Sequence, residues 1–267
     1  MITEPGLYNM DCMIALKEYP DNYFDLAIVD PPYGDAGGGF SGTERFGERF
    51  DRYRNPENKQ GGGGMESTST TWAHYQRKNC RKPDGTWGFA NRRNMGDEVC
   101  KKIIAWDTAP KQEYFDELFR VSRNQIIWGG NYFNLPPTRC FLIWRKLTIS
   151  ENFSMAMAEY AWTSFNGNAK VFEHVPQDAT GTRFHPTQKP VKLYEWILNR
   201  YAKKGDKILD THVGSASSLI ACQRLGFRFV GYEIDEDYYK LAKERYERET
   251  AQITLFNLNH REETNHE

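Results

Sequence analysis

The sequence of 267 residues is long enough to bury a sizeable core, and its 39% hydrophobic and 14% aromatic content is that of a globular protein. No apolar run approaches the roughly 20 residues of a membrane-spanning helix, and the first residues lack the basic-then-apolar pattern of a secretory signal. The five cysteines are scattered, which argues against a disulfide framework or a zinc site. We therefore expect a cytoplasmic protein without a metal site or membrane association.

The formal net charge of −1 conceals an uneven distribution along the chain. Residues 41–102 contain 13 Lys and Arg against 8 Asp and Glu, a local balance of +5. A local basic surface can bind phosphate groups whatever the total charge of the protein. An ordinary solvated surface has the same composition, so charge alone leaves both interpretations open.

Short apolar runs of strand length alternate with amphipathic stretches of helix length, which is typical of an α/β fold with a mostly parallel sheet. The expected strands are residues 24–29, 125–129, 140–144, 157–165, 207–210 and 228–233. The expected helices are residues 11–19, 112–121, 190–203, 216–226 and 236–249. Pro190 suits the first position of its helix, and Gly226 suits the end of the next one.

Residues 35–100 do not follow this alternation and form a long insertion in what we otherwise expect to be one domain of residues 1–267. The insertion contains glycine runs and a Ser/Thr run, and it mixes Lys and Arg with aromatic side chains. Basic residues interleaved with aromatic ones suit contact with phosphates and stacking on bases. Two interpretations stay open. The insertion is either a region that contacts nucleic acid and recognises its target, or a surface loop without a role in the function.

The first strongly apolar strand leads into Asp30-Pro31-Pro32-Tyr33. The two prolines fix the backbone directly after Asp30, so the carbonyl groups there point in set directions. The Asp30 carboxylate and the Pro31 carbonyl can accept both N–H groups of an exocyclic amino group on a base, which makes the nitrogen lone pair available for attack. Tyr33 offers an aromatic face to the same base. The alternative is a proline pair that only terminates a strand.

Residues 207–235 contain a second candidate site. A strand ends at Asp210, the small-residue turn Gly214-Ser215-Ala216 follows, and the next strand ends at Glu233. Ligands of open α/β sheets bind beyond the carboxyl ends of the strands, and an acidic residue that closes the second strand can accept two ribose hydroxyls. Because the turn lacks the G-x-G-x-x-G pattern, a nucleoside ligand without a pyrophosphate fits better.

Seven motifs in one consistent order resemble the β group of DNA amino-methyltransferases, and most of all the small adenine-specific enzymes of phages and prophages. The motifs are LYNMDC (7–12), DPPYG (30–34), IIWGGNYF (126–133), EYAWTSF (159–165), HPTQKP (185–190), DTHVGSAS (210–217) and GYEID (231–235). The resemblance implies a Rossmann-like methyltransferase fold with a circularly permuted, mostly parallel sheet. It also implies S-adenosylmethionine as the methyl donor, without a metal.

The resemblance further implies which residues form the site. Catalysis is expected from Asp30, Pro31, Pro32 and Tyr33. The expected cofactor-binding residues are Asp11, Cys12, Asp30, His185, Pro186, Thr187, Gln188, Lys189, Asp210, Thr211, His212, Val213, Gly214, Ser215, Glu233 and Ile234. Within this set, Asp11 is expected to close a strand near the cofactor adenine, and residues 185–190 are expected against the methionine moiety. Ala216 stands where the family pattern would have glycine, and it adds strain only if this position has a positive φ.

The expected partner is double-stranded DNA, whose target base must be flipped out of the helix to reach such a site. The resemblance implies that an aspartate before the proline pair favours N6 of adenine, and N4 of cytosine is the alternative with the same nitrogen chemistry. Methylation of RNA or of a protein glutamine, and a DNA-binding protein with impaired catalysis, are further alternatives. Trp162 is expected in the core, with a position beside the flipped base as the alternative. A homodimer and a monomer are both open.

Overall fold

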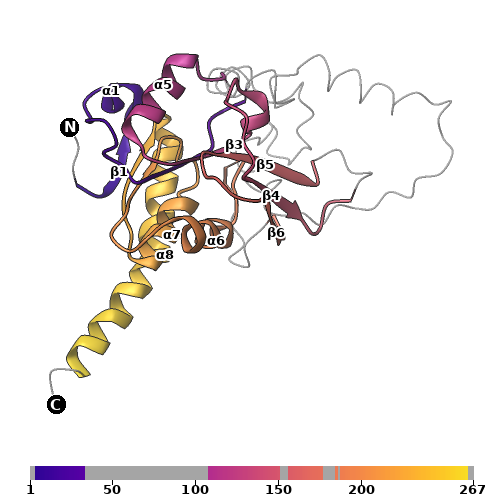
Figure 1. The fold of residues 1–267 in the computed structure, drawn as a ribbon. Helices are drawn as coiled ribbons and strands as arrows, with labels where there is room; N and C mark the ends of the chain where they lie inside the picture. Colours follow the sequence, from indigo (N-terminus) through magenta and orange to yellow (C-terminus); the bar gives the residue numbers. More distant parts are fainter. Residues whose placement is uncertain (1–3, 34–107, 151–155, 177–183, 186, 264–267) are drawn as a thin grey trace, which may run out of the picture. The chain divides into compact units, whose positions relative to one another are not determined.

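The structure is a computed structural model that describes residues 4–33, 108–150, 156–176, 184–185 and 187–263, with side chains described as far as residue 251. The chain divides into two compact units, residues 1–31, 110–181 and 185–267 in the first and residues 32–109 and 182–184 in the second. All labelled helices and strands belong to the first unit (Figure 1). The predicted insertion at 35–100 lies outside the described residues, and the prediction of a single domain stays a prediction.

The helices and strands of the first unit follow the predicted order. The strands are β1 (Gly6–Asn9), β2 (Leu26–Val29), β3 (Gln125–Trp128), β4 (Phe141–Lys146), β5 (Ala158–Thr163), β6 (Lys170–His174), β7 (Lys207–Asp210) and β8 (Arg228–Glu233). The helices are α1 (Cys12–Leu16), α5 (Gln112–Val121), α6 (Val191–Tyr201), α7 (Ser217–Leu225) and α8 (Glu236–Glu263), with a short 3-10 turn, η4 (Gly130–Tyr132). None of the helices in the described part of the chain is long and apolar enough to cross a membrane.

The structure differs from the sequence predictions at β6, at the end of α8 and at the start of α6. Strand β6 was not predicted, because it contains no buried residue and therefore has no sustained apolar run. Helix α8 extends to Glu263, beyond the predicted end at residue 249, because no glycine or proline follows to stop it. Pro190 precedes α6 as its N-cap residue, whereas we expected it at the first helical position. Gly226 ends α7 with a left-handed φ of 73°, as predicted.

The eight strands form one sheet in the order β1-β8-β7-β2-β3-β5-β4-β6. Strands β1, β8, β7, β2 and β3 are parallel to one another, and β5 is antiparallel to both β3 and β4. Strand β7 comes late in the chain but lies at the centre of these five parallel strands, with β8 and β1 on one side and β2 and β3 on the other. This order confirms the predicted α/β fold with a permuted, mostly parallel sheet.

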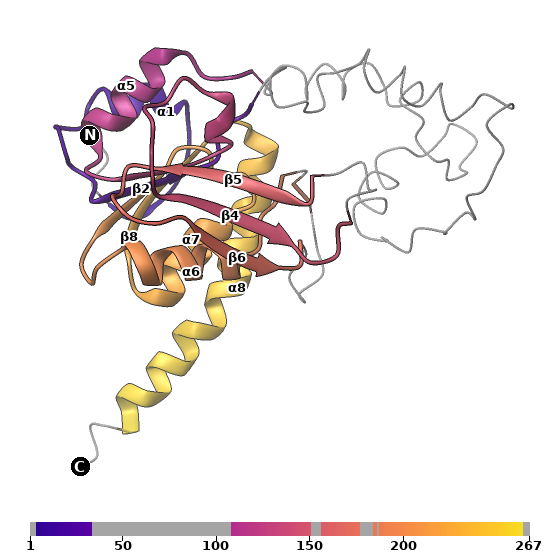
Figure 2. The ribbon, with the colours of Figure 1, turned by 45° about the vertical axis from the view of Figure 1, so that its right-hand side comes forward.

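Helices cover both faces of the central strands (Figure 2). In β2, Leu26 and Ile28 pack against the side of α6, α7 and α8, whereas Ala27 and Val29 pack against the side of α1 and α5. Because both faces are buried, such strands are uninterrupted apolar runs in the sequence. Trp162 is 6% exposed, and its indole N–H donates to the Pro136 carbonyl at 2.6 Å, so the structure places it in the core.

Candidate active site

Three acidic side chains lie at the carboxyl edge of the sheet, where β2, β7 and β8 end. Asp30 directly follows β2, while Asp210 and Glu233 are the last residues of β7 and β8. The strand order reverses between β7 and β2, which is where open α/β sheets place their ligands. Burial, with a smaller contribution from the neighbouring Asp30 and Glu233 charges, raises the pKa of Asp210 to about 7. This edge therefore favours a ligand with positive charge and disfavours a pyrophosphate.

Glu233 is positioned to receive a diol. Its carboxylate accepts the N–H of Gly214 at 2.9 Å and the N–H of Asp235 at 3.0 Å. A carboxylate accepts about four hydrogen bonds, so two further acceptor sites suit two hydroxyl groups. Burial raises the pKa of Glu233 above its ordinary value, and the backbone N–H groups of Asp235, Gly214 and Ile234 oppose that shift. The residues present therefore fit the ribose of a nucleoside ligand.

Gly214 allows His185 to approach the turn between β7 and α7. Gly214 has a φ of 54°, and a Cβ added there would lie 3.2 Å from Cε1 of His185. The imidazole packs at 4.5 Å, between ring centroids, on Tyr238 of α8, and its Nδ1 lies 3.1 Å from the Thr187 hydroxyl. His185 is thus held against the small-residue turn, and its place beside the methionine moiety stays a prediction.

Arg245 of α8 forms hydrogen bonds to this turn, a role that we did not predict from the sequence. Its buried guanidinium donates to the Ser215 carbonyl and to the Ser217 hydroxyl, both at 2.8 Å. The Ser217 hydroxyl in turn donates to the Lys189 carbonyl at 2.7 Å. The sequence shows Arg245 only as one of many charged residues in a polar helix, so nothing local distinguishes it.

Ala216 adopts the conformation that strains an alanine. Its φ is 62° and its ψ is 17°, in the left-handed region, and the residue is fully buried at the start of α7. A non-glycine residue costs about 1–2 kcal/mol in this region. The backbone N–H of Ala216 still donates to the Val213 carbonyl at 3.1 Å, so the turn forms despite that cost.

The ammonium group of Lys189 contacts the Asp30 carboxylate directly. It also lies 3.1 Å from the carboxylate of Glu159 on β5, which pairs with Lys146 of β4 at 2.6 Å. We predicted Lys189 as a cofactor-binding residue, and we did not predict roles for Glu159 and Lys146. In the sequence, Glu159 and Lys146 are distinguished only as charged residues within otherwise apolar strands. The sequence alone does not show which residue each of them pairs with.

The remaining predicted cofactor residues differ in their surroundings. Strand β1 ends at Asn9, so Asp11 does not close it and instead caps α1 by accepting the Met13 N–H at 2.9 Å. Burial, and then the charge of Asp11, raise the pKa of the Cys12 thiol to about 12, so this thiol is unreactive. Gln188 donates its backbone N–H to the His185 carbonyl at 3.2 Å, and Ile234 is 63% exposed beside Glu233.

Thr211, His212 and Val213 form the start of the turn after β7. The Thr211 hydroxyl lies 2.6 Å from the Tyr114 hydroxyl of α5 and 2.9 Å from Nδ1 of His212. Burial lowers the pKa of His212 to about 4, so its imidazole is neutral at physiological pH. The Val213 N–H donates to the Tyr232 carbonyl at 3.0 Å. These contacts anchor the turn between α5 and β8.

The predicted catalytic residues fall into both units. Asp30 and the buried Pro31 belong to the first unit, and Pro32 and Tyr33 belong to the second. Pro186 lies outside the described residues. Within the described part of the chain, no group of three His, Cys, Asp or Glu side chains is arranged to hold a metal ion.

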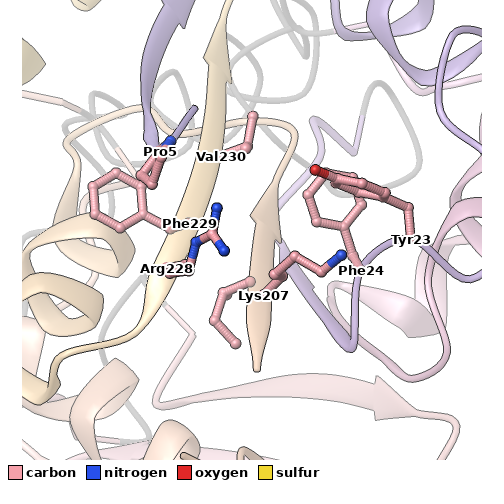
Figure 3. A pocket seen from close by; sticks show the side chains of 8 residues that line it. Pro5, Tyr23, Phe24, Lys207, Arg228, Phe229 and Val230 are labelled. Carbon is pink, nitrogen blue, oxygen red and sulfur yellow. The ribbon is translucent and has the colours of Figure 1, made fainter. Parts of the chain in front are cut away.

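A shallow pocket lies at the other end of the same strands (Figure 3). It is lined by Lys207 and Arg228, the first residues of β7 and β8, and by Tyr23, whose ring lies 3.7 Å from the Lys207 ammonium. Because the three acidic residues follow the carboxyl ends of the strands, this pocket is separate from the candidate active site.

The raised pKa of Asp210 predicts a pH-dependent stability. Between about pH 4 and pH 7 the folded protein holds a proton on Asp210 that the unfolded chain has released, so this stabilising contribution is lost as the pH rises. We expect Asp210→Asn to remove that loss. The difference in the free energy of unfolding, Asp210→Asn minus wild type, should increase between pH 5 and 8 by on the order of a few kcal/mol.

Chemical unfolding at a series of pH values measures this difference. The buried His212 has a lowered pKa and loses stability towards acid, but it does so equally in both proteins and cancels in the difference. The matched control is Asp206→Asn in the surface turn before β7, where Asp206 accepts the Lys203 N–H at 2.8 Å. A difference between Asp210→Asn and the wild type that does not change with pH contradicts the prediction.

Comparison with known protein families gives one match over most of the chain. A model of N6- and N4-methyltransferases, described as DNA methylase, matches residues 24–244. The type II methyltransferase M2.LlaDCHI of Lactococcus lactis subsp. cremoris is 41% identical over 263 residues, which cover 90% of this chain and 88% of the relative. The type II methyltransferase M2.DpnII of Streptococcus pneumoniae is 46% identical over 65 residues, 24% of each protein.

Similar solved structures are more distant. The cytosine-N4-specific PvuII DNA methyltransferase is 11% identical, with 94% of this chain and 92% of that chain covered and a TM-score of 0.48. Likeness at this level has no bearing on the base that is modified. The two relatives named above come from Streptococcus and Lactococcus, so the resemblance to phage and prophage enzymes stays a prediction.

Proposed function

The chain belongs to the DNA methylase family, and on that basis we propose that it transfers the methyl group of S-adenosylmethionine to the N6 amino group of adenine in double-stranded DNA. The observation that supports this best is the place of Asp30, at the end of β2 and next to the strand β7 that leads into the candidate cofactor turn. Aspartate before the proline pair favours adenine over cytosine. A cytoplasmic location, expected from the scattered cysteines, accords with a DNA substrate.

The cofactor is assigned to the turn after β7 and the end of β8. Glu233 would bind the ribose, Gly214 and Ser215 would let the backbone approach the ligand, and His185 to Lys189 would border the methionine end. When bound, S-adenosylmethionine supplies an electrophilic methyl group on a positively charged sulfur. The carboxylates of this edge suit such a cation, and the two basic side chains of the described residues nearby, Lys189 and Arg245, are already bonded to protein groups.

Asp30 and Pro31 act on the nucleophile. The amino nitrogen of adenine is a weak nucleophile, because its lone pair is conjugated with the ring. The Asp30 carboxylate and the Pro31 carbonyl accept its two N–H groups, which favours a tetrahedral nitrogen with an available lone pair. Positive charge then develops on the nitrogen beside acceptors that are already in place, which is where preorganised groups lower a barrier most.

The target adenine must leave the DNA stack, and Tyr33 is proposed to hold it. Stacking on an aromatic side chain contributes roughly 1–3 kcal/mol per base, which offsets part of the few kcal/mol that base flipping costs. We expect Tyr33→Ala to reduce the fluorescence increase of 2-aminopurine placed at the target position, with cofactor affinity unchanged. Tyr33→Phe keeps the aromatic face and serves as the matched control. An equal fluorescence increase in the alanine variant contradicts this role.

Analysis of the methylated product tests the proposed function. The protein is incubated with radiolabelled S-adenosylmethionine and double-stranded DNA of mixed sequence, and the DNA is digested to nucleosides. We expect the label in N6-methyldeoxyadenosine. Label in N4-methyldeoxycytidine would show a cytosine enzyme with the same chemistry, and label only in RNA or protein would refute a DNA substrate. Sequencing the methylated sites of an expressing host then identifies the recognition sequence.

A further inference from the structure

Four charged side chains of alternating sign form a continuous chain of ion pairs that begins at Asp30. Lys189 contacts Asp30, Glu159 lies 3.1 Å from Lys189, and Lys146 lies 2.6 Å from Glu159. The side chain of Lys189 is 2% exposed and that of Asp30 is 13% exposed, so the pair is shielded from solvent. All four residues belong to the first unit, and we call them the Asp30 ion chain.

Stability alone does not account for the Asp30 ion chain. Removing a charge from water costs several kcal/mol, and apolar side chains of similar size often stabilise a core at least as well as a buried ion pair. Desolvation by itself would lower the pKa of Lys189, but the charges of Asp30 and Glu159 outweigh it and raise that pKa. Lys189 is therefore a permanent cation, held between two carboxylates in a buried place.

Lys189 is also bonded to the candidate cofactor turn. Its backbone carbonyl accepts the Ser217 hydroxyl at 2.7 Å, and Arg245 holds that hydroxyl at 2.8 Å. The following Pro190 has a fixed φ of −68°, which restricts the backbone beyond Lys189. The Lys189 ammonium lies 5.3 Å from the ring centroid of the buried Trp128, and this ring further restricts the Lys189 side chain. Backbone and side chain together therefore connect the cofactor turn to Asp30.

We propose that Lys189 is a positioning residue for methyl transfer: it fixes the orientation of the Asp30 carboxylate relative to the cofactor turn, and Glu159 and Lys146 fix Lys189. This inference rests on the proposed role of Asp30. An ammonium on Oδ2 sets the rotation of the carboxylate group and thereby the direction of Oδ1. Because the amino nitrogen is activated only by acceptors in the correct direction, a small rotation of this carboxylate is costly in rate.

Three substitutions test the inference on the full-length protein. Lys189→Met removes the charge, Lys189→Arg keeps a cation of different shape, and Glu159→Gln removes only the charge of the second link. The matched controls are Lys192→Met and Glu173→Gln, because each changes an exposed residue whose ion pair lies on the surface. The measurements are the single-turnover rate at saturating cofactor and DNA, the Kd for S-adenosylmethionine by calorimetry, and the thermal unfolding midpoint.

We expect Lys189→Met to lower the single-turnover rate about 100-fold while the cofactor Kd changes less than about threefold. Lys189→Arg should recover most of that rate, and Glu159→Gln should lower the rate about tenfold with the cofactor Kd unchanged. Both controls should keep the wild-type rate. If Lys189→Met does not fold, Lys189→Arg and Glu159→Gln still decide the question, since both keep hydrogen-bonding side chains of similar size.

Two outcomes overturn the inference. A wild-type rate in Glu159→Gln, together with a wild-type rate in Lys189→Met wherever that variant folds, would show that the Asp30 ion chain does not act on Asp30. A cofactor affinity that falls in Lys189→Met as much as the rate would instead make Lys189 a ligand of the cofactor. Failure of the proposed function is distinguishable, because the wild-type protein itself would then methylate no adenine in DNA.

Discussion

Asp30→Ala is expected to lower the single-turnover rate of methyl transfer at least about 1000-fold, because it removes one of the two acceptors that activate the amino nitrogen. The affinity for S-adenosylmethionine should change less than about threefold, because Glu233 and the turn after β7 are not touched. Rapid-quench measurement of labelled DNA gives the rate, and calorimetry gives the affinity. A single-turnover rate within tenfold of the wild type would refute the catalytic assignment.

Two further variants separate chemistry from folding. Asp30→Ala leaves Lys189 buried with one carboxylate instead of two, which destabilises the protein. Asp30→Asn keeps the shape and one acceptor oxygen, and it should remain folded while losing most of the rate. The matched control is Asp25→Asn at the other end of the same strand, where the side-chain oxygen can still accept the Lys207 N–H that Asp25 accepts at 2.9 Å. We expect the wild-type rate from this control.

Glu233→Ala is expected to weaken S-adenosylmethionine binding about 100-fold or more, because two hydrogen bonds to a charged acceptor contribute roughly 1.5–3 kcal/mol each. At saturating cofactor the single-turnover rate should change little, because Glu233 is assigned to the ribose and not to the transferred methyl group. Calorimetric titration and the single-turnover rate at rising cofactor concentration measure the two effects separately.

The controls for Glu233 address the backbone of the turn. Glu233→Ala leaves the Gly214 N–H without the oxygen that accepts it at 2.9 Å, so the turn itself can shift. Glu233→Gln keeps an oxygen for that N–H and should still weaken binding, because its amide group replaces one acceptor by a donor. Glu236→Ala changes an exposed carboxylate three residues later, paired with Lys240, and should bind normally. Unchanged cofactor affinity in Glu233→Gln would contradict the ribose assignment.

The sequence by itself determines most of the central sheet and the two segments that contain the candidate site residues, 30–33 and 207–235. The bounds of β7, β8 and α5 coincide with the predicted ranges, because apolar runs and amphipathic periodicity are local properties of the chain. Asp30, Asp210 and Glu233 can be assigned to one edge because the carboxyl ends of parallel strands meet there. The seven motifs then identify the family.

Only the tertiary structure decides which side chains meet. Lys189 and Asp30 are 159 residues apart, and their contact depends on how the segment before α6 crosses the end of β2. The φ of 62° at Ala216 is likewise a property of the assembled turn, since alanine alone favours the helical region. Neither follows from local propensity, because long-range packing can offset the strain of one backbone and the desolvation of four charges. The sequence determines the motif Asp30-Pro31-Pro32-Tyr33, and the fold decides which cation contacts its carboxylate.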